Sequence, residues 1–147
     1  LTSARFEFTE WSHIIRALEI DQNTKANWVL ANSSHVIDLA FYFSGLPLKL
    51  DSKNSGSLDW HPSGSRFCGS GVTENNVLFS YFADWESAGR WSLELFTKVR
   101  RIILSPMEKI QIMNVGSTII ESIDIEDSLD VDFKPGLYKQ TLAFLTG

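Results

Sequence analysis

From residue 48 to residue 125 the sequence consists of short runs rich in β-branched and aromatic residues, separated by turn residues. The runs that we predict as strands are PLKL, SGSLDW, SRFCGSGV, NVLFSYFADW, RWSLELFTK, RRIILS, EKIQIMN and STIIESIDI. The breaks between them, such as HPSG and TENN, have the residues of tight turns. An earlier run, SARFEFTEW at residues 3–11, alternates apolar and polar side chains as a half-buried strand does. Short strands joined by turns predict an open, mostly antiparallel sheet.

The strongest of these runs has apolar residues on both faces. One face carries Val77, Phe79, Tyr81, Ala83 and Trp85, and the other carries Leu78 and Phe82. If helices cover one face of the sheet, the second apolar face needs a cover of its own. A partner subunit is our first candidate, and a sheet that curls onto itself is the alternative. We therefore predict an α+β fold with helices packed on one face of the sheet and a subunit interface on the other.

One helix is predicted before the strands, over NWVLANSSHVIDLAFYFSG, with Asn27 as its N-cap and Gly45 just past its end. Projected at about 100° per residue, this helix is apolar nearly all round, which predicts burial on most of its surface. Its polar residues Asn32, His35 and Asp38 must then find partners or face a polar cavity, because an unpaired buried polar group is costly.

The C-terminal part begins with an acidic segment, ESIDIEDSLDVD. Its acids alternate with Ile and Val, so we interpret it as the outer face of a strand rather than as a metal site. Pro135 suits the first turn of a last helix, which Leu137, Leu142 and Leu145 would anchor.

Composition excludes several classes of function. A net charge of -5 with no large basic cluster argues against nucleic-acid binding. The single cysteine, Cys68, excludes an internal disulfide, fits a reducing cytoplasmic compartment and is expected to be a buried, inert thiol. No spacing of Cys and His suits zinc, and no apolar run reaches the roughly 20 residues that cross a bilayer. The 147 residues suit one domain, and because Leu1 is not a methionine we expect the chain to be part of a longer one.

The segments HVIDLAFYFSGLP, GRWSLELFTKVRRIIL and DFKPGLYKQTLAFL together resemble the C-terminal domain of the Gfo/Idh/MocA family, named after glucose–fructose oxidoreductase and inositol dehydrogenase. The resemblance spans nearly the whole chain, and the His-x-x-Asp helix that ends in Gly is its most specific element. It implies a substrate-binding domain that forms a dimer or tetramer through its sheet and acts on sugar-like or polyol substrates.

The resemblance also implies that NAD or NADP binds to an N-terminal Rossmann domain that is not in this chain. No G-x-G-x-x-G follows a strand, and GSGV at residues 69–72 is interpreted as a turn or bulge. The family segment Glu-Lys-Pro, with its lysine, is absent. We therefore expect this chain alone to bind no nicotinamide cofactor and to turn over no substrate.

By the resemblance, His35 is the candidate catalytic residue, acting on the hydroxyl proton while hydride leaves the carbon; the alternative is a core histidine with satisfied hydrogen bonds. Asn32, Asp38, Trp28 and Arg90 are candidate substrate-binding residues, although Asp38 is more easily explained as a structural ion-pair partner and Trp28 as a core residue.

Many family members carry an aspartate four residues before the histidine, where this sequence has Ala31. Two hypotheses follow. The chain is the substrate domain of an NAD(P)-dependent oxidoreductase, or it is a non-catalytic assembly or ligand-binding module with the same fold.

Overall fold

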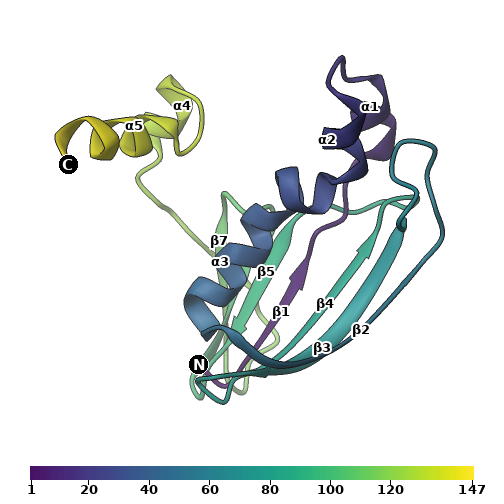
Figure 1. Ribbon diagram of the computed structural model, residues 1–147. Coiled ribbons are helices and arrows are strands. Elements are labelled where there is room, and N and C mark those ends of the chain that lie inside the picture. The colour runs from purple at the N-terminus through teal and green to yellow at the C-terminus, as the bar shows by residue number, and fades with distance from the viewer.

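The computed structural model describes residues 1–147 as one eight-stranded sheet with helices (Figure 1). The strands are β1 (Ser3–Glu7), β2 (Pro47–Ser55), β3 (Arg66–Thr73), β4 (Leu78–Asp84), β5 (Ser92–Phe96), β6 (Arg100–Leu104), β7 (Ile110–Asn114) and β8 (Glu121–Ile123). The helices are α1 (Ser12–Ala17), α2 (Gln22–Ala26), the π-helix η1 (Val29–Ser33), α3 (Ser34–Ser44), α4 (Ser128–Asp132) and α5 (Leu137–Thr146).

The strand order is β2-β3-β4-β1-β5-β6-β7-β8, so the first strand of the chain lies in the middle of the sheet. β1 pairs in parallel with β4 and antiparallel with β5, and every other pair is antiparallel. The predicted α+β class with an open, mostly antiparallel sheet is confirmed. The two edge strands, β2 and β8, do not pair with each other, so the sheet does not close on itself.

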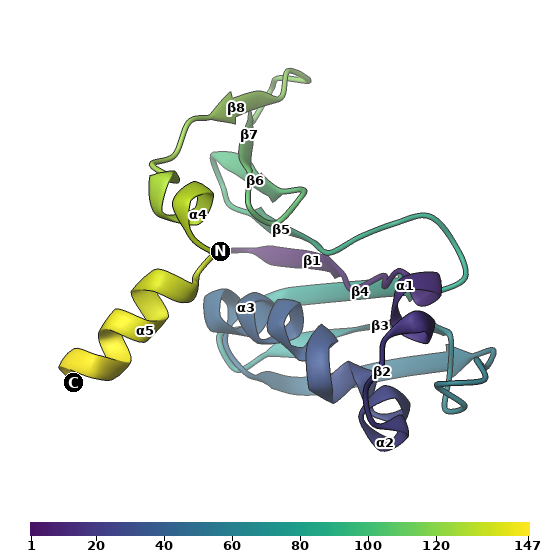
Figure 2. The same ribbon diagram turned by 90° about the horizontal axis from the view of Figure 1, so that it is seen from above.

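Helix α3 lies over one face of the sheet, whereas α1 and α2 lie beyond the ends of the strands (Figures 1 and 2), and the core lies beneath α3. Val36 and Ala40 of α3 are fully buried against inward side chains of β1, β4 and β5, such as Phe6, Ala83 and Leu93. Phe6 and Ala83 are on the apolar side of the alternation that was predicted for each of their strands. The burial of Val77, Phe79, Ala83 and Trp85, with Leu78 63% and Phe82 53% exposed, confirms that assignment.

The helical segment differs from the prediction at its start and in its burial. Asn27 is not an N-cap but ends α2, which Asp21 caps by accepting a hydrogen bond from the Thr24 N–H at 2.9 Å. The turn that follows is the π-helix η1, and the chain continues directly into α3. Gly45 ends α3 as predicted, with φ of +88°, a backbone conformation that glycine adopts without strain.

Only one side of α3 is buried, so the prediction of burial nearly all round was wrong. Tyr42 is 80% and Phe43 47% exposed, because the sheet covers this helix from a single direction.

The outer face of the sheet carries no helix and mixes apolar with charged side chains. Glu94, which points to this face from β5, is buried and forms ion pairs with Arg5 at 2.5 Å and with Arg101. Leu78 and Phe82 lie on the same face and are exposed. The chain therefore does not curl over to cover its own outer face.

Three predictions for residues 55–72 were wrong. SGSLDW is a loop rather than a strand, because Trp60 packs into the core, where its ring stacks on Trp85 at 5.6 Å between centroids. GSGV is not a turn but the regular centre of β3, where Gly69 pairs with Tyr81 and Gly71 with Phe79. Cys68 is exposed rather than buried, since it points from β3 to the open face of the sheet.

The two C-terminal helices, α4 and α5, lie apart from the sheet (Figures 1 and 2). The acidic run forms only the short strand β8 and then α4, and α5 begins at Leu137, two residues after Pro135. Leu137, Leu142 and Leu145 do not anchor α5 within this chain, because they are 48%, 47% and 74% exposed. No helix of the chain has both the length and the apolar character needed to cross a membrane.

Candidate functional site

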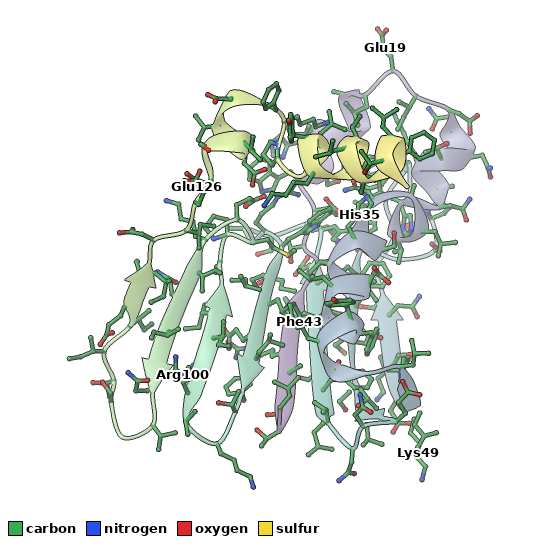
Figure 3. All side chains as sticks on the ribbon, turned by 90° about the vertical axis from the view of Figure 1, so that its left-hand side faces the viewer. Glu19, His35, Phe43, Lys49, Arg100 and Glu126 are labelled. Carbon is green, nitrogen blue, oxygen red and sulfur yellow. The ribbon has the colours of Figure 1, made fainter.

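His35 lies near the start of α3, at the opposite end of this helix from Phe43 (Figure 3). Its side chain is exposed and makes no hydrogen bond within the chain. Its ring lies 6.2 Å from the ring of Trp91, measured between centroids, at an angle of 54°. The imidazole nitrogens are therefore free to contact a ligand at this surface, which is unlike the packing of a core histidine.

Asp38 and Ala31 also lie on exposed parts of the helical segment. Asp38 forms neither an ion pair nor a hydrogen bond with another side chain, so the expected structural ion pair is not present. The methyl group of Ala31 offers no proton acceptor. Neither residue supplies a carboxylate partner to His35 within the chain.

The π-helix η1 places two neighbouring polar residues toward the end of β1. The Asn32 side-chain amide donates a hydrogen bond to Glu10 Oε1 at 3.0 Å, and the Ser33 hydroxyl donates to the same oxygen at 2.7 Å. A π-helix bonds i to i+5, and this wider turn is rare and frequently found at functional sites.

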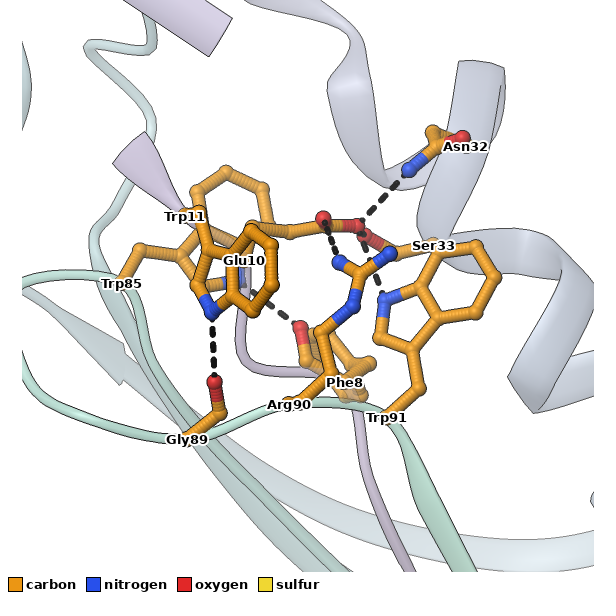
Figure 4. Close-up of polar contacts among 9 residues, drawn as sticks. All are labelled: Phe8, Glu10, Trp11, Asn32, Ser33, Trp85, Gly89, Arg90 and Trp91. Atoms are coloured by element: carbon orange, nitrogen blue, oxygen red, sulfur yellow. Dashed lines mark hydrogen bonds and ion pairs between the residues drawn. The ribbon is translucent and has the colours of Figure 1, made fainter. Parts of the chain in front are cut away.

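Glu10 is the centre of this arrangement (Figure 4). It is 2% exposed and lies three residues after the end of β1 in the chain. Besides the two donors from η1, its Oε1 accepts a hydrogen bond from Trp91 Nε1 at 3.1 Å, and its Oε2 is 3.2 Å from Arg90 Nη1 in an ion pair. Four donors from two segments, η1 and residues 90–91, thus satisfy one buried carboxylate, which is the condition for burying a charged group.

Arg90 is fixed between two indole rings. Its guanidinium carbon lies 5.0 Å from the ring centroid of Trp11 and 4.8 Å from that of Trp91. Trp11 is held in turn by a hydrogen bond of 3.0 Å from its Nε1 to the Gly89 carbonyl. The Arg90 side chain remains 44% exposed, so the N–H groups that do not face Glu10 can reach a ligand.

Trp28 belongs to a different cluster. It is partly buried and packs edge to face against Trp60, with ring centroids 6.4 Å apart. Its indole nitrogen is buried and has no hydrogen-bond partner. The same cluster contains His61, which is 2% exposed and whose Nδ1 lies 2.7 Å from the Gly64 carbonyl oxygen.

The structure thus brings Asn32 and Arg90 together on Glu10, and it places His35 beside Trp91 of the same group. Glu10 was not among the residues predicted from the sequence. A signal was present, because Glu10 continues the inward series Ala4, Phe6, Phe8 by the same step of two. An acid at an inward position next to a strand requires buried partners.

The surroundings are open. A cleft of about 590 Å³ adjoins Glu10 and Trp11, lined by α1 and residues 85–89, but His35 does not line it. No group of three or more His, Cys, Asp and Glu side chains is arranged to hold a metal ion. Because His35 is exposed and does not line this cleft, it lies on a surface rather than in an enclosed cavity.

The fold is shared with solved structures, among them several dehydrogenases. Levoglucosan dehydrogenase, in complex with NADH and levoglucosan, matches with a TM-score of 0.64 and 15% identity over 86% of this chain and 40% of its own. UDP-N-acetylglucosamine 3-dehydrogenase GnnA from Acidithiobacillus ferrooxidans matches with a TM-score of 0.63 and 14% identity over 96% of this chain and 45% of its own. A super-repressor mutant of Gal80p from Saccharomyces cerevisiae matches with a TM-score of 0.56 and 12% identity over 86% and 40%.

No family model and no curated protein matches the sequence. The chain spans less than half the length of the solved structures that it matches. At these identities the likeness establishes the fold and not the activity. The Gfo/Idh/MocA resemblance stated from the sequence is thus confirmed at the level of the fold: this chain has the fold of part of the dehydrogenases of that family.

Proposed function

We propose that this chain is the substrate-binding and oligomerisation domain of an NAD(P)-dependent oxidoreductase that acts on a sugar-like or polyol substrate. The observation that carries the proposal is His35, exposed and free of hydrogen bonds beside Trp91, on a fold shared with a levoglucosan dehydrogenase bound to NADH. His35 lies at an open surface, so the proposal assigns the cofactor and the opposite wall of the site to a Rossmann domain elsewhere in the protein.

In the proposed reaction, a substrate hydroxyl loses its proton to His35 Nδ1 or Nε2 while its carbon loses hydride to NAD(P)⁺. An imidazole suits this step because it exchanges a proton near neutral pH. Arg90 contributes N–H donors that are already fixed by Trp11 and Trp91, so little side-chain entropy is lost when they bind a sugar oxygen. Asp38 is exposed on the same helix as His35 and is retained as a contact for a sugar hydroxyl.

Asn32 and Trp28 have weaker support as contacts to substrate. The amide nitrogen of Asn32 is committed to Glu10, so only its carbonyl oxygen remains to accept a hydrogen bond from a sugar. Trp28 is engaged with Trp60. The sheet supplies the oligomer contact in this proposal, because its outer face carries exposed Leu78 and Phe82 and no helix.

The first test is substitution of His35 in the full-length protein, assayed by NAD(P)H absorbance with a panel of sugars and polyols. A general base contributes about 10²- to 10⁴-fold to rate, so His35→Ala is expected to lower kcat at least about 100-fold. Its melting temperature should hardly change, because His35 is exposed and makes no hydrogen bond.

Tyr42→Ala is the matched control, since Tyr42 is 80% exposed on the same helix and is expected to keep full activity. Equal kcat in His35→Ala and the parent protein would refute the role of His35.

A second candidate function is a non-catalytic regulatory or assembly module. Two observations favour it. The fold is shared with a super-repressor mutant of Gal80p, and Ala31 stands where an acid would be expected. A full-length protein that binds NADH or NADPH but turns over no sugar or polyol would support this second function over the first.

A further inference from the structure

Two carboxylates of the chain are buried, and they lie on opposite faces of the sheet. Glu94 is 9% exposed on the outer face, paired with Arg5 and Arg101. Glu10 is 2% exposed and bonds the π-helix that leads into α3. Glu94 therefore provides an internal comparison for any role that is specific to Glu10.

Glu10 joins the segments that surround His35. Ser33 and Asn32 immediately precede α3, so their two hydrogen bonds fix the start of the helix that carries His35. The hydrogen bond from Trp91 Nε1 to Glu10 (Figure 4) fixes the Trp91 indole. The centroid of this ring lies 6.2 Å from that of the His35 imidazole. Through these contacts a single carboxylate determines where both rings lie.

We propose that Glu10 is a positioning residue of the site, which holds η1, Trp91 and Arg90 in one arrangement and thereby sets the position of His35 for reaction. This inference rests on the proposed function, in which His35 accepts the substrate proton. Glu10 itself touches no reacting atom: its oxygens are occupied by Asn32, Ser33, Trp91 and Arg90. Its contribution is the pre-organisation of the groups around it.

The isosteric change Glu10→Gln disrupts this arrangement with little change in shape. Four donors point at the two carboxylate oxygens. An amide has one accepting oxygen and a nitrogen that only donates. Whichever way the amide turns, its nitrogen meets a donor, either Arg90 or the group of Asn32, Ser33 and Trp91. Glu94→Gln removes a buried carboxylate in the same way on the other face and is the matched control.

The experiment measures kcat, KM and melting temperature of both variants in the full-length protein. A misplacement of about 1 Å in a site can cost about 100-fold in rate, and Glu10→Gln is expected to lower kcat about 10-fold or more. Glu94→Gln should lower the melting temperature comparably and leave kcat within about twofold, since only stability depends on it. If Glu10→Gln lowers melting temperature alone, as Glu94→Gln does, the positioning role is refuted.

A double-mutant cycle tests whether Glu10 acts through Trp91. Trp91→Phe keeps an aromatic ring beside His35 but removes the N–H that donates to Glu10 at 3.1 Å. If both changes release the same ring, the double variant should be no slower than the slower single variant. Effects on kcat that multiply would overturn this link.

A second readout does not depend on turnover. The ring current of Trp91 acts on the His35 ring, so the His35 Cε1–H resonance of the full-length protein, assigned by its loss in His35→Ala, reports their relative position. We expect this resonance to move in Glu10→Gln and to stay in place in Glu94→Gln. If the parent protein turns over no substrate, the proposed function fails, and this resonance still decides the inference: an unmoved signal in Glu10→Gln refutes it.

Discussion

Gly71 in β3 is the position where one added methyl group should disturb the sheet most. A Cβ atom there would lie 2.0 Å from the Lys49 carbonyl oxygen of β2 and 2.8 Å from Phe79 Cζ of β4. Phe79 is 4% exposed, and its ring packs edge to face on Phe41 of α3 at 5.1 Å. The substitution Gly71→Ala must therefore push β2 away, displace Phe79 toward the helix that carries His35, or do both.

The magnitude follows from these contacts, with Gly69→Ala as the comparison. Overpacking a core costs about 1–3 kcal/mol, and each ladder hydrogen bond lost when β2 moves adds about 0.5–1.5 kcal/mol. Replacing either glycine by alanine also lowers the entropy of the unfolded chain, which stabilises the fold by about 0.4–1 kcal/mol. A Cβ at Gly69 would lie 2.6 Å from side-chain atoms of Tyr81, which can move without the backbone. We expect a net loss of about 3 kcal/mol for Gly71→Ala and about 1 kcal/mol for Gly69→Ala.

Thermal unfolding followed by circular dichroism measures this difference. For a chain of this size, about 2 kcal/mol corresponds to roughly 4–8 °C in melting temperature. Urea unfolding gives the same comparison as a free energy. If the two alanine variants melt within 1–2 °C of each other, the contact with the Lys49 carbonyl does not limit the packing of β3.

Two further predictions concern the outer face and the C-terminal segment. Phe82→Asp places a charge on the outer face of the sheet and should raise the monomer fraction measured by light scattering. The control Val99→Asp, in the turn between β5 and β6, should leave the monomer fraction unchanged. An unchanged mass for Phe82→Asp would contradict the proposed interface. Hydrogen bonds from the Ser128 side chain and backbone N–H lower the pKa of Glu126, so this acid stabilises the fold above its unfolded pKa and the contribution is lost as pH falls through its folded pKa. Ser128→Ala should raise the pKa of Glu126 in an NMR titration, and an unchanged pKa would show that the hydroxyl is not involved.

The strands of the sheet could be predicted because their information is local. The alternation of Phe79, Tyr81 and Ala83 with outward residues needs only a period of two. The end of α3 was predicted for a similar reason, since a glycine at residue 45 suits a positive φ. The segment DSKNS, residues 51–55, has low β-propensity but forms the second half of β2, because its backbone pairs with β3. No local property of the segment indicates this partner.

The candidate site was predicted less completely, because its contacts are distant in sequence. Asn32, Arg90 and His35 were identified by residue type and resemblance. Their connection runs through Glu10, which is 22 residues from Asn32 and 80 from Arg90. Burial of α3 was overestimated because an apolar composition does not show how many sides of a helix are covered within one chain.

The π-helix has a consequence for how this protein is compared with its structural neighbours. Counting back four residues from His35 to Ala31 assumes a uniform helix, but that interval enters η1, where the turn holds one more residue than an α-helical turn. A relative with a regular helix in this place would align with a one-residue gap, or with side chains matched to the wrong neighbours. Equivalent positions before His35 should therefore be assigned by superposing backbones, and residues found in this way can differ from those found by spacing.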